Sequence, residues 1–322
     1  MIRYLSHSDI ENLEVSGLML ADGIEKILAA AANGCAQNNP KSSCQLPDGR
    51  LFQSILAVGI DAPAPPYAAT KVVGLSPFNH DKGLPHIGSV IVLLDGYTGL
   101  PCCIMDGSWI TAMRTAALSL VVARRFARSD AKTMGFIACG AQARAHLTVF
   151  KQQFPIGFVT AYSRRPESAK KFVDWCRTQG VEAQWSPHPE AAVTGQDIVV
   201  SSVPDQSAPL AFLRAEWLAP GSFAALVDLG RSWCDQGFDD VDHRIVDSRE
   251  QAEKSQKVRR FTPAGPYTMD LQELIEAPTP WRSCSSERAI FVFQGLALAD
   301  LAAAAIVYDQ SIATNTGTLL PE

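Results

Sequence analysis

Long runs of Lys and Arg, CxxC cysteine pairs and internal repeats are all missing from this chain of 322 residues. The formal net charge is −5 at neutral pH, so the chain lacks the positive field that a nucleic-acid backbone requires. None of the eight cysteines forms a CxxC pair, and none lies near a histidine at the spacing of a zinc finger. We therefore expect no nucleic-acid partner and no metal site.

Signals for a membrane or for secretion are also lacking. The two most apolar windows are residues 115–123 and 296–307. The first is too short to span a bilayer, and the second carries Asp300 in its middle. Residues 1–9 show neither the basic nor the apolar segment of a signal peptide. We expect a cytoplasmic protein with free thiols and no membrane contact.

What the chain does have is enough apolar sequence for two folded domains. Hydrophobic residues make up 47% of it and charged residues 19%, a balance that excludes a disordered chain. A length of 322 residues exceeds what one hydrophobic core usually organises.

The first hundred residues predict an α+β domain with an antiparallel sheet. Ser6 and Asp9 have the spacing of a capping box at a helix start. The runs 69–75 and 89–94 have the composition of strands, and the segment 95–99 has the Asp-Gly chemistry of a hairpin turn.

Beyond residue 129 the pattern changes to alternating strands and helices, which indicates a doubly wound parallel sheet of the Rossmann type. A long helix at 108–127 comes before it, and an Ala-rich helix at 296–308 follows it and is expected to return to the first domain. The predicted strands are 133–138, 158–162, 181–185, 197–202, 222–228 and 244–247, and the helices between them are 141–154, 167–179 and 249–257.

The first strand-to-helix turn of this region predicts a dinucleotide site. The glycine fingerprint is present in part, as Ala138, Gly140 and Ala143. Gly140 permits close approach of the backbone to phosphate, whereas Ala138 carries a Cβ at a position that normally has none. Cofactor contacts are expected from Cys139, Gly140, Ala141, Gln142 and Ala143. An ordinary strand-to-helix turn is the alternative.

The end of the second strand predicts which dinucleotide is bound. An NAD site places an acid there to bind the ribose hydroxyls, but here Ser163, Arg164 and Arg165 occur with no acid before Glu167. Guanidinium groups suit a 2′-phosphate, so we expect NADP(H) to be preferred and NAD(H) to be possible. The alternative is that both arginines are solvated loop residues. Ser202 and Val203 are further expected cofactor contacts.

Three charged residues lie in otherwise apolar stretches. Lys71 lies within a strand, Arg114 lies within the long helix, and Asp228 ends the strand 222–228. A substrate carboxylate would explain both cations, because a buried unpaired charge is costly and Arg provides a two-point clamp. The alternative is an internal ion pair between Lys71 and an aspartate, with an arginine that extends to solvent.

At this level of detail the sequence resembles the ornithine cyclodeaminase/mu-crystallin family over essentially its whole length. The motifs that carry the resemblance include Lys71-Val72-Val73, Gly83-Leu84-Pro85, Thr98-Gly99-Leu100-Pro101, Asp106, Thr111, Arg114-Thr115-Ala116-Ala117, and the stretches 139–147, 246–252 and 299–304.

The resemblance implies a homodimer with two domains. Residues 1–112 and 300–322 would form the domain that binds substrate and dimerises, and residues 113–299 would form the Rossmann domain. The implied roles are carboxylate binding by Lys71 and Arg114, proton transfer by Asp228 or Lys71, and cofactor contact by Thr111. His86, after Gly83-Leu84-Pro85, is a further candidate near the substrate, although a lone histidine is more often structural.

Two positions depart from the family pattern. The family carries an Arg after a proline in the first domain, whereas here Pro40 is followed by Lys41, which we expect to bind substrate without the fork geometry of Arg. Cyclodeaminases typically have a Gly-Asp-x-Pro-Gly-Lys stretch around the aspartate, whereas residues 227–233 read Val-Asp-Leu-Gly-Arg-Ser-Trp.

These departures favour an NAD(P)-dependent enzyme that reduces a cyclic ketimine, Δ1-pyrroline-2-carboxylate or Δ1-piperideine-2-carboxylate, to proline or pipecolate. The arginine-rich ribose site favours a reductant that exchanges, whereas a cyclodeaminase recycles its NAD. The alternatives are an ornithine cyclodeaminase, a hydroxyproline dehydratase and a crystallin-like protein that binds NADPH without turnover. The expected partner is a small amino or imino acid.

Overall fold

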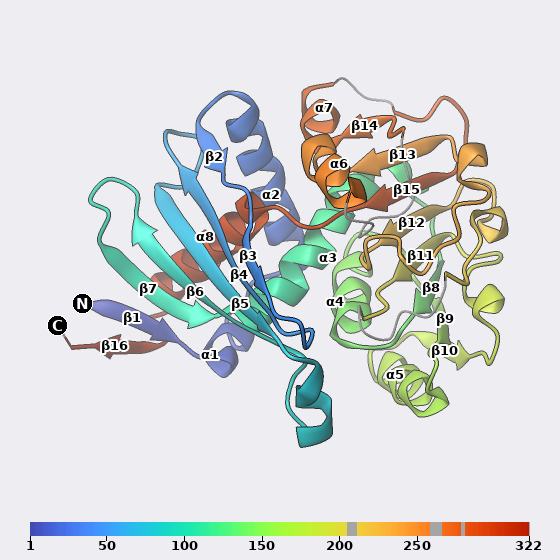
Figure 1. The fold of residues 1–322 in the computed structure, drawn as a ribbon, viewed down its shortest axis with the longest axis horizontal. Helices are drawn as coiled ribbons and strands as arrows, with labels where there is room; N and C mark the ends of the chain where they lie inside the picture. The colour runs from blue at the N-terminus through green and yellow to red at the C-terminus, as the bar shows by residue number, and fades with distance from the viewer. Residues whose placement is uncertain (205–210, 258–265, 278–280, 322) are drawn as a thin grey trace. The chain divides into compact units, whose positions relative to one another are not determined.

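The computed structural model describes residues 1–204, 211–257, 266–277 and 281–321. The chain divides into two compact units, drawn in Figure 1. The first unit comprises Met1–Leu118 and Leu296–Glu322, and the second comprises Ser119–Gly295. These divisions lie six residues after and four residues before the boundaries expected from the sequence, after residues 112 and 299.

The first unit is built on a mostly antiparallel sheet of eight strands in the order β16-β1-β7-β6-β5-β4-β2, with β3 paired to β4. Only the pairing of β1 with β7 is parallel among the described strands of this sheet. The strands are β1 (Ile2–Leu5), β2 (Ala36–Asn38), β3 (Ser42–Gln45), β4 (Leu51–Gly59), β5 (Tyr67–Leu75), β6 (Ile87–Asp95), β7 (Pro101–Asp106) and β16 (Thr318–Leu320).

The local signals predicted for this unit are confirmed. Ser6 and Asp9 form a reciprocal capping box at the start of α1 (His7–Glu11). The turn between β6 and β7 closes at Asp95, whose Oδ1 accepts hydrogen bonds from the backbone N–H of Tyr97 and of Thr98. An acceptor side chain at the first residue of a turn satisfies the backbone donors that the strands leave behind.

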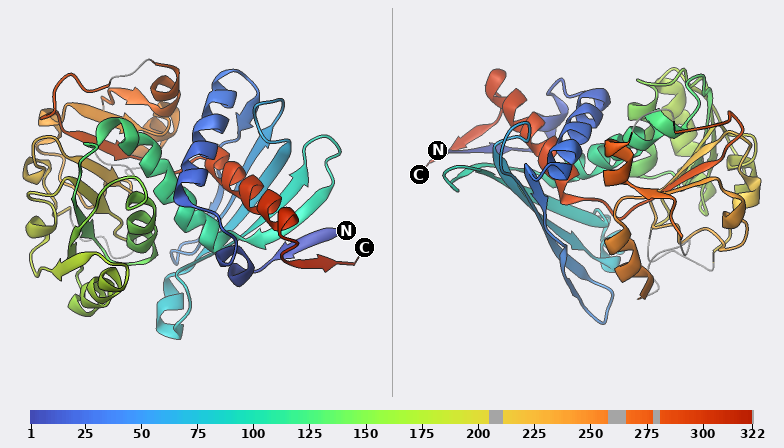
Figure 2. Two further views of the ribbon diagram at one scale, coloured as in Figure 1. Left: turned by 180° about the vertical axis from the view of Figure 1, so that it is seen from behind. Right: turned by 90° about the horizontal axis from the view of Figure 1, so that it is seen from above.

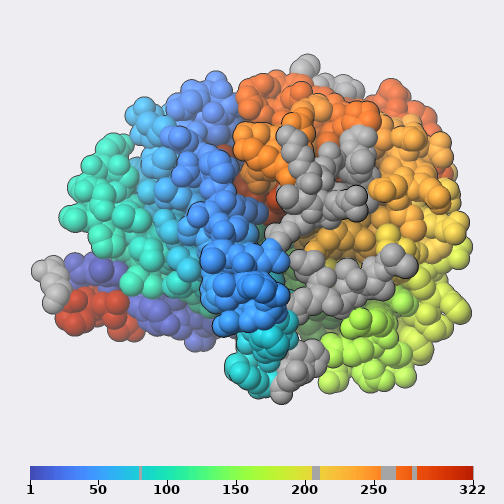
Figure 3. Space-filling model, in the orientation of Figure 1, coloured from blue at the N-terminus to red at the C-terminus, as the bar shows by residue number. Residues whose placement is uncertain are grey.

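One face of this sheet is covered by α2 (Gly17–Ala32) and α8 (Ala297–Ala313), as Figures 1 and 2 show. The opposite face carries apolar side chains that remain exposed, seen from outside in Figure 3 as the blue-to-teal surface. They alternate with the buried positions of the same strands, as the period of two along a strand requires, and include Phe52, Leu56, Val72 and Val90.

The second unit contains the predicted parallel sheet, in the order β10-β9-β8-β11-β12-β15-β13-β14. Every pairing in it is parallel among the described strands. The strands are β8 (Thr133–Ile137), β9 (Phe158–Tyr162), β10 (Glu182–Trp185), β11 (Ile198–Ser201), β12 (Phe223–Leu226), β13 (His243–Val246), β14 (Met269–Asp270) and β15 (Ala289–Val292). The order reverses between β8 and β11, and a doubly wound sheet binds its ligand at such a switch point.

Helices surround this sheet, and α3 enters the unit from the first one. They are α3 (Gly107–Phe126), α4 (Ala141–Phe150), α5 (Pro166–Thr178), α6 (Arg249–Lys257) and α7 (Leu271–Glu276), with short 3₁₀ segments Pro77–Lys82 (first unit), Pro189–Ala192, Ala215–Trp217 and Phe238–Asp240. Within the described ranges, no helix has both the length and the apolar character needed to cross a bilayer.

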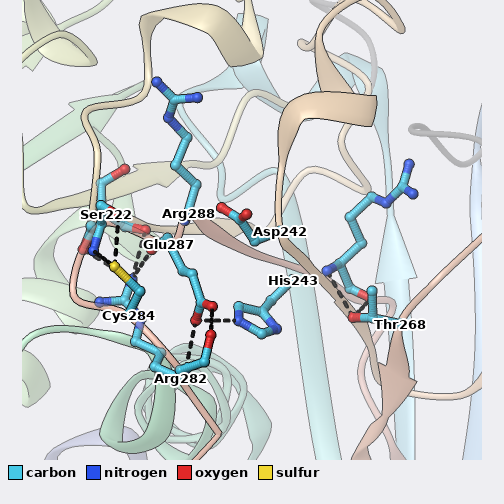
Figure 4. A network of polar contacts seen from close by, with 12 residues as sticks. Ser222, Asp242, His243, Thr268, Arg282, Cys284, Glu287 and Arg288 are labelled. Carbon is cyan, nitrogen blue, oxygen red and sulfur yellow. Dashed lines mark hydrogen bonds and ion pairs between the residues drawn. The ribbon is translucent and has the colours of Figure 1, made fainter.

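A polar network ties together the segments that lead into three of the parallel strands (Figure 4). Glu287 accepts hydrogen bonds from Nε2 of His243 at 2.9 Å and from the backbone of Ser283 at 3.0 Å. The hydrogen bond from His243, together with those from Ser283, lowers the pKa of Glu287 to about 2. The backbone N–H of Arg288 donates to Asp242 at 2.7 Å. The network lies at the strand starts, opposite the carboxyl ends that form the switch point.

Candidate functional site

The turn between β8 and α4 presents open backbone donors, as a phosphate site requires. Gly140 is the N-cap of α4. Among the described residues, no side chain caps that helix, and a Cβ at Gly140 would meet nothing within 4 Å. Ala138 takes a φ of 69°, the left-handed region that a residue with a Cβ avoids at a cost of about 1–2 kcal/mol. The backbone thus keeps the conformation of the glycine fingerprint although the glycine itself is replaced.

A cavity of about 470 Å³ lies beside this turn, at the carboxyl ends of β8, β9 and β11. It is lined by the turn, by the residues after β9 and by the residues after β11: Ile137, Ala138, Cys139, Gly140, Tyr162, Ser163, Arg164, Arg165, Ser168, Pro189, Val203, Pro204 and Phe212. Open N–H groups, arginines and apolar rings in one cavity fit the phosphates, ribose and adenine of a dinucleotide.

The three residues expected near the ribose line this cavity. They are Ser163, Arg164 and Arg165, and α5 begins directly after Arg165 with no side-chain cap among the described residues. A helix N-terminus and guanidinium groups both favour a phosphate. The only described acid nearby in sequence, Glu167, does not line the cavity.

Cys139 and Gln142 contribute to the turn in different ways. The Cys139 thiol donates to the carbonyl oxygen of Tyr162 at 3.4 Å, and burial raises its pKa to about 12, so the thiol remains protonated. Oε1 of Gln142 is buried and has no hydrogen-bond partner among the described residues. Ser202 donates its backbone N–H to Ile137, which holds the ends of β11 and β8 together.

Asp228 is buried and fully engaged within the second unit. Its carboxylate accepts hydrogen bonds from Ser201 Oγ at 3.1 Å, from the backbone N–H of Val203 at 3.3 Å and from Ser232 Oγ at 2.5 Å. Trp233 donates its indole N–H to Ser201 Oγ at 2.9 Å. Burial raises the pKa of Asp228 and these donors oppose the rise. The aspartate therefore connects the end of β12 to the cavity residue Val203.

The first unit contains a buried cluster of three charged side chains. Lys71 Nζ lies 2.6 Å from Asp300 Oδ1, and Arg114 Nε lies 2.9 Å from the same oxygen. The three residues come from β5, α3 and α8, and their exposed fractions are 1% for Lys71, 7% for Arg114 and 3% for Asp300. Burial and the neighbouring Arg114 lower the pKa of Lys71 to about 7.

The cluster tests the alternative interpretation of Lys71 and Arg114, an internal ion pair with an arginine that extends to solvent. The internal ion pair of Lys71 with an aspartate is present, whereas the expectation that the arginine extends to solvent is wrong, since Arg114 is buried on the same carboxylate. Lys41 lies close enough to lower the pKa of both Lys71 and Asp300. The described residues contain no group of three or more His, Cys, Asp or Glu side chains arranged for a metal ion.

The last two candidates are His86 and Thr111. Lys71 pairs with Ile91 across the sheet, whereas His86 precedes Ile87, so five residue steps, about 17 Å of strand, separate His86 from that pairing. Thr111 belongs to the first unit, where its hydroxyl lies 3.4 Å from Ser89 Oγ. The expected contacts of His86 with substrate and of Thr111 with cofactor stay predictions.

Asp300, Ser201 and Trp233 were not predicted from the sequence as parts of these sites. Asp300 is a charge within an apolar helix and part of a family motif, and that charge is the sequence signal for its pairing with Lys71. Ser201 and Trp233 carried no comparable signal.

Comparison with known proteins agrees with this geometry. The model of the ornithine cyclodeaminase/mu-crystallin family matches residues 3–315. The chain is 30% identical to alanine dehydrogenase of Archaeoglobus fulgidus, over 98% of this chain and 96% of that protein. It is 28% identical to the ketimine reductase mu-crystallin of Mus musculus, over 95% and 96% of the two chains.

Solved structures show the same fold over the same length. The Δ1-pyrroline-2-carboxylate reductase of Thermococcus litoralis, in complex with NADH and L-proline, has a TM-score of 0.88 at 26% identity, over 99% of this chain and 100% of that one. An archaeal alanine dehydrogenase dimer with bound NAD has a TM-score of 0.85 at 28% identity, over 99% of both chains. With a family model that spans nearly every residue, the chain belongs to the ornithine cyclodeaminase/mu-crystallin family.

Proposed function

We propose that this protein is an NAD(P)-dependent oxidoreductase that reduces a small cyclic ketimine, Δ1-pyrroline-2-carboxylate or Δ1-piperideine-2-carboxylate, to proline or pipecolate. The observation that carries the proposal is the buried cluster in which Lys71 and Arg114 share the single carboxylate of Asp300. Two relatives support the reaction class, since one is a ketimine reductase and the other reduces Δ1-pyrroline-2-carboxylate.

The charge of the cluster favours an anionic ligand. With Lys71 protonated, two buried cations face one anion, and Lys41 adds further positive potential. Unbalanced buried charge is costly, so an anion that binds here would stabilise the arrangement. The carboxylate of an α-imino acid supplies that anion and offers two oxygens to the planar guanidinium of Arg114.

The two cations can divide the work of ketimine reduction. Arg114 would hold the carboxylate, which fixes the imine relative to the protein. Lys71, with a pKa of about 7, would both bind the carboxylate and deliver the proton that the ring nitrogen requires. A bound NAD(P)H would supply the hydride.

Asp228 is the less favoured proton donor. Its oxygens already accept hydrogen bonds from Ser201, Val203 and Ser232, all in its own unit, and it is buried. We propose that Asp228 positions the cavity segment around Val203, and that Lys71 carries the proton.

For the cofactor we propose a preference for NADP(H) over NAD(H). Solved relatives contain NADH or NAD, so the fold accepts the unphosphorylated dinucleotide. In this chain Arg164, Arg165 and the uncapped start of α5 line the ribose end of the cavity. These groups would bind a 2′-phosphate through charge-assisted hydrogen bonds.

We also propose a homodimer that forms through the first unit. The uncovered face of its sheet exposes Phe52, Leu56, Val72 and Val90, and large apolar side chains exposed together on one sheet face are typical of an interface. The archaeal alanine dehydrogenase relative is a dimer.

The test is NADPH consumption with Δ1-pyrroline-2-carboxylate by wild type and by Arg114→Ala. We expect turnover in wild type and a loss on the order of 100-fold in kcat/KM in the variant, because a charge-assisted contact is removed. Arg124→Ala is the matched control, since Arg124 lies on the same helix and contacts Gln153. If wild type ignores both ketimines but converts ornithine to proline and ammonia with NAD, the cyclodeaminase alternative is correct.

A further inference from the structure

One carboxylate oxygen holds both cations of the proposed clamp. Asp300 Oδ1 lies 2.6 Å from Lys71 Nζ and 2.9 Å from Arg114 Nε. All three side chains belong to the first unit, and each is more than nine-tenths buried. Asp300 Oδ1 is therefore occupied by the two cations, and it supplies the one negative charge that both of them share.

The contact leaves part of Arg114 available. Nε is close to Asp300 but is not aligned as a hydrogen bond, and Nη1 is buried without a hydrogen-bond partner among the residues described. A guanidinium presents its donors as a rigid fork, so an anion on the Nε edge fixes the direction of the remaining edge. A buried and unsatisfied Nη1 is costly unless a ligand completes it.

The start of α8 fixes the position of Asp300. Oδ1 of Asn38 accepts hydrogen bonds from the backbone N–H of Ala297 at 2.8 Å and of Leu298 at 3.3 Å. Asp300 lies in the first turn of that helix, where the helix dipole favours a negative charge. The carboxylate is thus placed by backbone contacts that do not depend on Lys71 or Arg114.

Three positively charged groups of the described chain face Asp300. Lys71 approaches from β5, Arg114 from α3 and Lys41 from the segment before β3. Burial raises the pKa of Asp300, but the three cations outweigh it and the pKa lies below its usual value. Asp300 in turn raises the pKa of Lys71, against the larger lowering effects of burial and Arg114.

We propose that Asp300 is a positioning residue of the carboxylate clamp: it holds Lys71 in its ammonium form and fixes Arg114 by the Nε edge, so that both cations meet the carboxylate of one α-imino acid. This inference rests on the proposed function and adds to it the residue that sets the charge of the clamp.

Removing the negative charge of Asp300 should change the pH at which Lys71 titrates. In Asp300→Asn, the opposing negative charge is gone, and the pH at which Lys71 titrates should fall by about one to three units. The alkaline limb of kcat/KM for the ketimine should move by the same amount, with KM raised more than kcat is lowered. Binding of NADPH, whose proposed cavity lies in the second unit, should not change.

The experiment follows the Lys71 side chain directly, by NMR of protein labelled with 13Cε-lysine, with Lys71→Arg to assign the resonance. Asp309→Asn is the matched control, since Asp309 lies on the same helix and accepts a hydrogen bond from Tyr67. A shift in Asp300→Asn but not in Asp309→Asn supports the inference. Equal titration of Lys71 in wild type and Asp300→Asn overturns it.

A second variant keeps the inference testable if Asp300→Asn does not fold. Asp300→Glu keeps the charge but displaces it, so Lys71 should titrate as in wild type while KM for the ketimine rises. An unchanged KM overturns the inference. If Lys71 shifts as expected but wild type reduces no ketimine, the role of Asp300 in charging the cluster is supported and the proposed reaction is wrong.

Discussion

The hydroxyl of Ser119 lies 2.9 Å from Nε2 of His146, and both side chains are completely buried. Nδ1 of His146 lies 2.8 Å from the carbonyl oxygen of Gln142 and therefore carries the hydrogen, which leaves Nε2 to accept from Ser119. The imidazole is thus neutral, and burial lowers its pKa to about 4. It fixes α4, the helix of the phosphate turn, to α3.

This contact predicts acid sensitivity of the fold. Between pH 6.5 and about 4 the unfolded chain binds a proton at His146 that the folded chain does not bind. The free energy of unfolding should therefore fall by about 1.4 kcal/mol per pH unit as the pH drops through this window. Urea denaturation at a series of pH values measures this free energy. In His146→Gln, the free energy of unfolding should depend less steeply on pH than in wild type. His188→Gln, which changes an exposed histidine outside this contact, is the control.

Asp228→Asn separates a positioning role from proton transfer. The carboxylate now accepts hydrogen bonds from three donors. In the variant, the amide NH₂ group would face one of these donors, at a cost of about 1–3 kcal/mol. We expect a lower Tm and weaker NADPH binding, with the pH midpoints of kcat/KM unmoved. Loss of one limb of the pH profile, with NADPH binding intact, would instead make Asp228 the proton donor.

Arg164 and Arg165 should determine cofactor choice. Changing each to Ala removes charge-assisted hydrogen bonds to a 2′-phosphate, so the Kd of NADPH should rise roughly 10- to 100-fold. The Kd of NADH should change by less than about twofold, because NADH has no 2′-phosphate to lose contact with. Fluorescence titrations of both cofactors measure this, with Arg177→Ala on α5 as control. Tighter binding of NADH than of NADPH by wild type would refute the preference.

The uncovered sheet face should hold the dimer together. Val72 and Val90 are cross-strand partners and both are exposed, so a Lys at either position would place a charge at the centre of the patch. Light scattering after gel filtration should show monomers for Val90→Lys. Ile312→Lys, at an exposed position of α8, should not change the mass. A wild-type monomer, or a dimer that survives Val90→Lys, would contradict this interface.

Local chemistry in the sequence was sufficient to predict most of the second unit. The strands that lead into α4 and α5 are bounded by helices of ordinary length, and the capping box of Ser6 and the turn at Asp95 depend only on neighbouring residues. Several elements were not predicted, among them β4 and β15. β15 is a run of four buried apolar residues, and β4 carries apolar residues on both faces, so neither shows a clear alternation.

The charged cluster could not be predicted from local sequence patterns. Lys71 and Arg114 stood out because each is a cation in an apolar stretch. Their shared partner Asp300 is 229 residues away from Lys71 along the chain, and no local pattern joins them. Likewise β1 and β16 pair through residues at opposite ends of the sequence, which only the folded sheet brings together.

β1 pairs with β16, and the two lie side by side in Figure 1. This pairing affects the order in which the two units can fold during synthesis. The second unit is contiguous in sequence and can fold as soon as residue 295 has emerged, because domains fold as units during synthesis. The first unit must wait for α8 and β16, which follow the second unit in the sequence. Until then its nascent sheet has α2 but lacks α8, the second covering helix, and Lys71 and Arg114 lack the carboxylate of Asp300.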